Sequence, residues 1–294
     1  MAIKVGLSLW INSFLKEKPD KLLDKLLNNN IDFIELSIDY PWPYNRRDLL
    51  FKALDFIRDR KLYLGLHAPW RDLAIASPYE DISEASVRVV IDSLKNILDK
   101  YDIVKYVVIH ASTHQKIEVL DSLEDLNEKL VKRIEKIYSG ISKYNNVYLL
   151  IENLSYSIAG NMDFLVKALE KTSIERIGFC LDIGHLARYY NRNIAGSGYY
   201  RDFYDYLREV LDLINNTLND RVLTVHLHDV DNENEHLLIG EGFLNFKEIY
   251  RLLGLIKPEY VVYEVFRSKK RKINIESILD VIGAQKTWLR IYAY

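Results

Sequence analysis

Histidines and carboxylates recur in this sequence at the ends of short apolar runs. Each of the seven histidines ends such a run or follows one: His67, His110, His114, His185, His226, His228 and His236. Glu152, Asp182 and Glu264 end three of the runs, and Glu35 lies within another. A carboxylate among apolar residues costs free energy unless it is paired, protonated or bound to a metal. Imidazole with carboxylate suits zinc, manganese, iron or cobalt, so these residues predict a divalent-metal site.

Two short spacings would bring pairs of these side chains together. Asp182-x-x-His185 can place two ligands on one turn. His226-x-His228 places both rings on the same face of a strand, because strand side chains repeat every two residues. A single histidine at a strand end is more often a hydrogen-bonded polar residue than a ligand, and Glu35 could pair with a basic neighbour. The gathering of all the histidines with three carboxylates favours the metal site.

The elements that must position these residues alternate along the chain. Eight short apolar runs predict strands at Lys4–Trp10, Asp32–Ile38, Tyr63–Ala68, Tyr106–Ala111, Val147–Glu152, Ile177–Asp182, Leu223–His228 and Tyr260–Val265. Helical spacing of apolar residues predicts helices at Lys21–Leu27, Arg47–Arg58, Glu84–Leu98, Leu123–Tyr138, Phe164–Leu169, Tyr204–Leu218, Phe246–Leu253 and Ile275–Trp288. None of the histidines falls in a predicted helix.

Eight strands that alternate with eight helices predict an α/β protein with a parallel sheet. A single (β/α)8 TIM barrel over residues 1–294 is the economical form, and its strand ends would converge on one face. An open doubly wound sheet is the runner-up, but the first strand is not followed by the glycine-rich turn usual there.

Composition narrows the classes of function. The formal net charge is −2, so the strongly basic surface typical of nucleic-acid binders is absent, and the basic run Arg267–Lys272 is interpreted as a solvated loop. Cys180, the single cysteine, is predicted to be buried. No apolar stretch approaches 18 residues and no signal peptide is recognised, which predicts a cytoplasmic protein without membrane contact. The frequent use of Lys, Glu and Ile resembles the amino-acid composition of proteins from thermophiles.

Several motifs resemble the xylose-isomerase-like barrel superfamily over nearly the whole chain. They are His67–Trp70 with Leu73–Pro78, Val108–His110, Ile151–Asn153, Cys180–His185, and His226–Asp229 with His236–Gly242. This superfamily includes sugar isomerases and epimerases, inosose dehydratases and the endonuclease IV family of apurinic-site nucleases. The wording of the motifs leans toward the sugar isomerase and epimerase branch.

The resemblance also implies a ligand set for one to three divalent ions, zinc, manganese or cobalt. A shared metal centre would consist of Glu152, Asp182, His226 and Glu264. In the nuclease family further ions are held by two strand-end histidines, which His67 and His110 match, and by a site to which His185 and His236 correspond. Asn234 stands where that last site has an aspartate, so a third ion is in doubt unless Asp231, Glu233 or Glu235 compensates.

The resemblance favours a metal-dependent sugar or sugar-phosphate isomerase or epimerase that works by proton transfer through an enediolate. Glu152 and Glu264 would lie on opposite sides of the substrate as catalytic base and acid, and His185 would orient hydroxyls or carry protons. Substrate contacts are expected from Trp10, Trp70, His228 and Arg267. The sequence is compatible with a homo-oligomer.

The alternative reaction is metal-dependent hydrolysis of the phosphodiester at an apurinic site, and only this hypothesis makes DNA the partner. Trp70 and Arg71 would then be residues that insert into DNA, although a role in the wall of a substrate pocket is at least as common. A binding protein without catalysis is a third hypothesis, but it would require key ligands to be missing.

Overall fold

The strands form a closed parallel barrel. The computed structural model describes residues 3–11, 13–16, 18–39, 47–113, 123–144, 146–218 and 221–292. Each strand pairs with the next one in the chain, and β8 closes the barrel against β1. The strands are β1 (Lys4–Trp10), β2 (Phe33–Ser37), β3 (Tyr63–His67), β4 (Val104–His110), β5 (Tyr148–Glu152), β6 (Ile177–Asp182), β7 (Val222–Leu227) and β8 (Tyr260–Tyr263). The predicted (β/α)8 barrel and all eight strands are confirmed, and no strand end differs from its predicted position by more than two residues.

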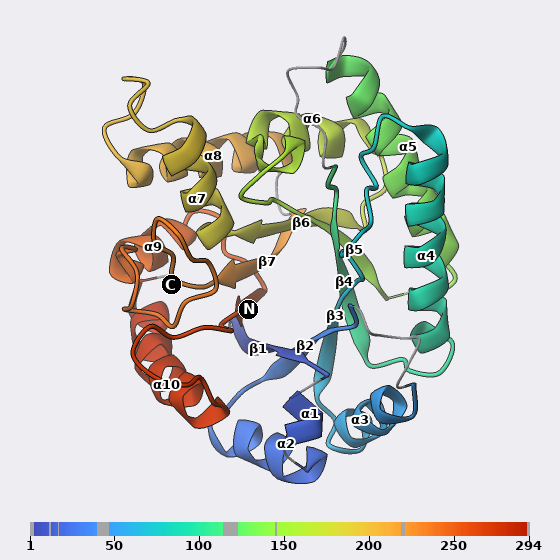
Figure 1. The fold of residues 1–294 in the computed structure, drawn as a ribbon, viewed down its shortest axis with the longest axis vertical. Coiled ribbons are helices and arrows are strands. Elements are labelled where there is room, and N and C mark those ends of the chain that lie inside the picture. The colour runs from blue at the N-terminus through green and yellow to red at the C-terminus, as the bar shows by residue number, and fades with distance from the viewer. Residues whose placement is uncertain are drawn as a thin grey trace.

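Helices surround the barrel (Figure 1). Those predicted from the sequence are α2 (Pro19–Asn28), α3 (Arg47–Asp59), α4 (Glu80–Leu98), α5 (Leu123–Ile141), α6 (Met162–Lys171), α8 (Phe203–Leu218), α9 (Phe246–Leu253) and α10 (Ile275–Tyr292). Their apolar stripes pack on the strands, as when Val87, Val90 and Leu94 of α4 become fully buried. No helix in the described ranges is both long and apolar enough to span a membrane.

Within the described residues, two further α-helices were not predicted: the short α1 (Ser13–Lys16) and α7 (Ile183–Asn193). α7 starts directly after β6, with Asp182 as its N-cap and no loop between strand and helix. The expectation that no histidine is helical was therefore wrong for His185, which lies in the first turn of α7. The apolar run of the strand continues into the helix, so the change of period is hidden in the sequence.

Aromatic rings fill the interior of the barrel below its mouth. Phe33, Tyr106 and Tyr260 pack against one another with ring centroids 5.0–6.3 Å apart, beside the buried Cys180. Gly6 provides the room, because a Cβ atom there would come within 2.4 Å of the Phe33 ring. Larger residues on these strands would displace the rings, so this packing forms a solid floor beneath the polar residues at the strand ends.

Candidate metal centre

Four ligand side chains converge where the strands end. Glu152 closes β5, Asp182 closes β6, His226 lies on β7, and Glu264 directly follows β8. His226 Nδ1 is 3.3 Å from Glu152 Oε1, 3.3 Å from Glu264 Oε2 and 3.9 Å from Asp182 Oδ2. All four of these atoms are buried and have no hydrogen-bond partner within the protein. Buried polar atoms without a hydrogen-bond partner destabilise the folded state. A cation bound between these four atoms would offset that destabilisation.

A second group lies beside the first. His67 Nε2, His110 Nε2 and Glu152 Oε2 form a triangle in which each side measures 3.1 Å. Ligands bound tetrahedrally to zinc at about 2.0–2.1 Å would be about 3.3–3.4 Å apart, so small movements would admit the ion. The donor set, two imidazoles and one carboxylate, also fits zinc, cobalt or manganese.

Glu152 belongs to both groups. Its Oε1 atom points to the group of Asp182, His226 and Glu264, and its Oε2 atom to the two histidines. Strand register produces this arrangement, because His110 is the Cα partner of Glu152, and Asp182 is the partner of His226. One carboxylate can therefore bridge two neighbouring cations.

Glu35 supports the first group from inside the barrel. Its Oε2 atom lies 3.1 Å from His226 Nε2 and accepts a hydrogen bond of 2.9 Å from the Tyr106 hydroxyl. Because His226 Nε2 is engaged in this way, its Nδ1 atom is left for the centre. The expectation that Glu35 pairs with a basic neighbour is confirmed, and the neighbour is His226.

Asn153 also orders this region, and sequence reasoning missed it. Its amide donates to the carbonyl of Asp182 at 2.9 Å, and its Oδ1 atom accepts the Asp182 N–H at 2.8 Å. Asp182 Oδ1 in turn accepts the His185 N–H at 2.6 Å, as the N-cap of α7. The IEN motif, in which Asn153 directly follows a ligand, was the only signal that could have revealed it.

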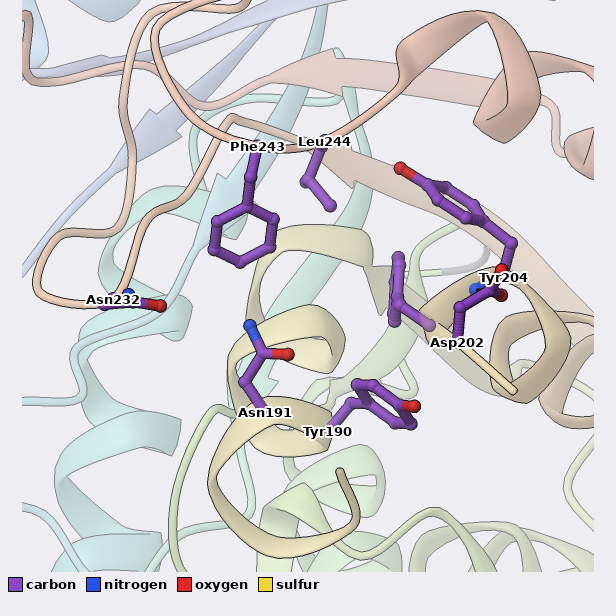
Figure 2. A pocket seen from close by; sticks show the side chains of 8 residues that line it. Tyr190, Asn191, Asp202, Tyr204, Asn232, Phe243 and Leu244 are labelled. Atoms are coloured by element: carbon purple, nitrogen blue, oxygen red, sulfur yellow. Dashed lines mark hydrogen bonds between the residues drawn. The ribbon is translucent and has the colours of Figure 1, made fainter. Parts of the chain in front are cut away.

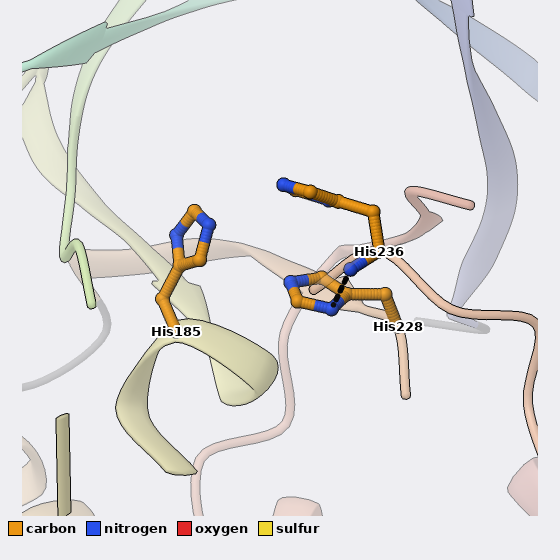
Figure 3. A group of neighbouring side chains, drawn as sticks. All are labelled: His185, His228 and His236. Carbon is orange, nitrogen blue, oxygen red and sulfur yellow. Dashed lines mark hydrogen bonds between the residues drawn. The ribbon is translucent and has the colours of Figure 1, made fainter. Parts of the chain in front are cut away.

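A third group consists of histidines. His185, His228 and His236 have ring centroids 4.2–5.3 Å apart and point toward a common space (Figure 3). His228 is fully buried and its Nδ1 atom accepts the His236 N–H at 2.9 Å. The structure thus brings all eight of the predicted ligands, together with His228, into three adjacent groups. His114 lies outside the described residues.

The sequence model for xylose isomerase-like TIM barrels matches residues 23–290. The chain belongs to this family. It is 25% identical over 224 residues to "Probable endonuclease 4" of Mycoplasmopsis pulmonis, covering 72% of this chain and 75% of the relative.

Solved structures with this fold also resemble the chain. A D-tagatose 3-epimerase-like protein superposes with a TM-score of 0.70 at 21% identity, covering 99% of this chain and 98% of the other. Endonuclease IV from Thermus thermophilus gives a TM-score of 0.65 at 19% identity, covering 98% and 99%. At such identities the likeness establishes the fold of this xylose isomerase-like barrel, which its relatives use for more than one reaction.

The ligand groups of this xylose isomerase-like barrel open into a cavity of about 920 Å³ at the mouth. Trp10, Trp70, Tyr156 and Phe266 supply aromatic walls, while Arg71, Arg267 and Lys272 bring positive charge. The Arg71 guanidinium lies over both Trp10 and Trp70 and pairs with Asp39 at 3.2 Å. Of the four expected substrate contacts, Trp10, Trp70 and Arg267 line this cavity, whereas the buried His228 does not.

In the metal-free protein, the pKa values of the buried histidines and carboxylates are shifted in different directions. Burial alone would lower the pKa of His67, but the hydrogen bond and charge of Glu152 raise it to about 9. Burial lowers the pKa of His110, and the nearby His67 acts in the same direction. For Glu152, burial is outweighed by His226 and His110, which hold the pKa well below its usual range. In the metal-free protein, protonated histidine thus balances the carboxylate charge that a bound metal ion would otherwise balance.

A separate, shallower pocket of about 520 Å³ lies between α7, α8 and the loop after β7 (Figure 2). Its lining contains Tyr190, Tyr204 and Phe243, with Asn191 and Asn232 at the sides. The Tyr204 hydroxyl is already engaged, because it accepts the Asn245 N–H at 2.6 Å. This pocket shares no lining residue with the cavity at the barrel mouth.

Proposed function

We propose that this family member is a divalent-metal-dependent phosphoesterase with a two-ion centre, and that the phosphodiester of abasic-site DNA is the first substrate to test. The observation that carries the proposal is Glu152, whose two oxygens belong to two different ligand groups. When bound, two neighbouring divalent ions acidify a water nucleophile and stabilise negative charge on a phosphoryl oxygen. The wording of the sequence motifs by itself favours an isomerase. Both reactions need the first ligand group, however, and only a centre with two ions uses His67 and His110 as ligands.

The chain's own residues suit a substrate that carries phosphate. Arg71, Arg267 and Lys272 line the mouth and offer cationic partners for phosphate oxygens. Trp10 and Trp70 line the same cavity, and the parts of their rings that Arg71 does not cover provide apolar surface against which a sugar or a base could pack. Glu152 and Glu264 are buried and line the same cavity, so the reacting bond would lie deep in the mouth.

Removing one ligand of the second group tests this function. Purified wild-type protein and His110→Ala and His67→Ala variants are loaded with zinc, desalted and analysed for zinc per chain. Each variant is expected to hold one ion fewer than the wild type and to lose incision of an oligonucleotide with a single abasic site. A wild type that holds one ion, with no fall in either variant, would contradict the two-ion centre.

A sugar or sugar-phosphate isomerase or epimerase is the second candidate, and one observation favours it. Glu152 ends β5 and Glu264 directly follows β8, and a carboxylate oxygen of each lies 3.3 Å from His226 Nδ1. One carboxylate could remove a proton from carbon and the other return it, as epimerisation requires. A cavity of about 920 Å³ is also within the range that encloses a small molecule.

The two candidates respond differently to the loss of the second group. Ketoses and ketose phosphates are incubated with the protein in D2O, and deuterium incorporation at carbon is followed by NMR. An isomerase that needs only the first group is expected to keep this exchange in His110→Ala, whereas phosphodiester hydrolysis is lost there. Exchange in the wild type together with no incision of abasic-site DNA would replace the phosphoesterase proposal by the isomerase.

A further inference from the structure

We infer that the hydroxyl of Tyr156 donates a hydrogen bond to an oxygen of the ligand that binds at the metal centre, which makes Tyr156 a substrate-contacting residue. The inference rests on the proposed function for the class of ligand, because a phosphoryl oxygen is the acceptor in phosphoester hydrolysis. It would hold equally for the enediolate oxygen of the second candidate. Tyr156 is not among the residues that the sequence predicts for the site.

Tyr156 belongs to the loop that follows the bridging glutamate. β5 ends at Glu152, and the short 3-10 helix η2 (Ile158–Gly160) begins two residues after Tyr156. The Tyr156 side chain lines the cavity of about 920 Å³, as do Glu152 and Glu235. Among residues 151–160, which the structure describes throughout, only Tyr156 is exposed, with 38% of its surface accessible. The loop therefore presents one exposed side chain to the cavity.

The hydroxyl of Tyr156 is available as a donor. It has no hydrogen-bond partner in the part of the chain that the structure describes. Burial raises the pKa of Tyr156, and the charges of Glu235 and Glu152 act in the same direction. The hydroxyl therefore keeps its proton at neutral pH. A neutral phenol can donate to an anionic oxygen at the centre, which an ionised carboxylate in the same place could not do.

The backbone next to Tyr156 is strained. Ser157 has a φ of 58° and a ψ of −168°, a combination that is essentially confined to glycine. Such conformations persist only where the surrounding structure fixes them, and they cluster at active sites and at ligand-binding segments. The loop retains this strain directly beside its one exposed side chain, which favours a functional role for that side chain.

Hydrogen bonds around Ser157 close the loop on itself. Ser157 Oγ accepts the Ala159 N–H at 3.3 Å, and the Ser157 carbonyl accepts the Gly160 N–H at 3.2 Å. The Leu154 N–H donates to the Ala159 carbonyl at 2.9 Å. Gly160 is packed so tightly that a Cβ atom there would come within 2.1 Å of a neighbouring aromatic ring. The backbone that carries Tyr156 is thus fixed before a ligand arrives, which lowers the entropy cost of the contact.

An aromatic wall without a hydrogen bond is the alternative role of this side chain. In that role only the ring would contact a sugar or a base, and phenylalanine would serve as well as tyrosine. The surroundings of the hydroxyl favour donation instead. An anionic oxygen close to Glu235 is repelled by that carboxylate, so a donor beside it offsets the repulsion.

Tyr156→Phe removes the hydroxyl and keeps the ring. Wild-type and variant proteins are loaded with zinc, and their affinity for methylphosphonate, which is not hydrolysed, is measured by calorimetry. Loss of a hydrogen bond to a charged group is expected to weaken binding roughly 10- to 150-fold. The zinc content per chain should stay the same, because Tyr156 is not a ligand. An unchanged affinity in Tyr156→Phe would overturn the inference.

Tyr189→Phe is the matched control. The ring of Tyr189 packs against Gly160 of the same loop but does not line the cavity. Removal of its hydroxyl should leave the affinity for methylphosphonate and the zinc content at their wild-type values. A loss of affinity as large as that in Tyr156→Phe would trace the effect to the loop and overturn the direct contact.

Methylphosphonate that fails to bind the wild type would contradict the phosphoesterase proposal and not this inference. Acetohydroxamate, which chelates zinc through two oxygens whatever reaction the centre performs, then replaces it as the probe, with the same loss expected in Tyr156→Phe. Crystals of the wild-type complex need no variant. The Tyr156 hydroxyl should lie about 2.5–3.0 Å from a ligand oxygen. A hydroxyl that points to solvent with the ligand in place would overturn the contact.

Discussion

Glu35 Oε2 lies 3.1 Å from His226 Nε2, and both side chains are fully buried. The carboxylate orients the imidazole and increases its basicity toward an ion on Nδ1. Glu35→Gln keeps the shape but loses the charge, so zinc affinity is expected to fall roughly 10- to 100-fold. Competition titration with a chromophoric chelator measures this. Glu259→Gln, which removes the partly exposed partner of Lys4 at the opposite end of the strands, is the control and should leave the affinity unchanged.

Glu152→Gln should remove two ions, because one side chain serves both groups. Asp182→Asn removes a ligand of one group only and should cost one ion. Turnover is expected to fall in Glu152→Gln by more than the roughly 100-fold that loss of an outer partner costs. Zinc analysis per chain and circular dichroism, which should show an intact barrel, are the measurements. Equal losses of zinc in the two variants would refute the bridging role.

The stability of the metal-free protein should depend on pH through His67. Its pKa is raised from 6.5 to about 9, chiefly by Glu152 acting against burial. The folded state therefore binds the proton more tightly than the unfolded chain, and this stabilisation is complete below pH 6.5 and lost as pH rises through 9. Urea unfolding at intervals across this range should show the loss, on the order of 1–3 kcal/mol.

Two comparisons check the origin of that pH effect. His67→Ala lacks the titrating ring and should flatten this part of the profile. Zinc displaces the proton, so zinc binding at pH 7 should release protons into the buffer, which calorimetry in buffers of different ionisation enthalpy detects. Zinc binding without proton release would show that His67 is neutral in the metal-free protein.

Gly184 is packed against His228. A Cβ atom at this position would lie 2.1 Å from His228 Cε1, so Gly184→Ala forces the ring to move. We expect a loss of about 1–3 kcal/mol in unfolding free energy, measured by urea unfolding, because the displaced ring disturbs the packing around it. Gly283→Ala is the matched control in α10, because no atom lies within 4 Å of its Cβ position. That control should be neutral or stabilise by up to about 1 kcal/mol, because alanine favours helix.

The barrel and most of the ligands could be predicted because they depend on local patterns. Buried parallel strands are continuous apolar runs, and their carboxyl ends converge wherever eight such units close. This convergence predicted a metal site at the mouth, and the resemblance to the family implied that Glu152, Asp182 and His226 belong to one centre. Helix α7 escaped prediction because Ile183 continues the apolar run of β6, and only the Asp182 cap marks the change from strand to helix.

By itself, the sequence determined which side chains reach the mouth of the barrel, since side-chain alternation and strand order depend on neighbours along the chain. Only the tertiary structure decided which of these side chains contact one another and which one belongs to two ligand groups. The bridging of Glu152, the pairing of Glu35 with His226, and the place of His228 beside His185 depend on strand register and on single ring orientations. These are contacts between residues 42 to 191 positions apart in the sequence, and no local pattern encodes their distances.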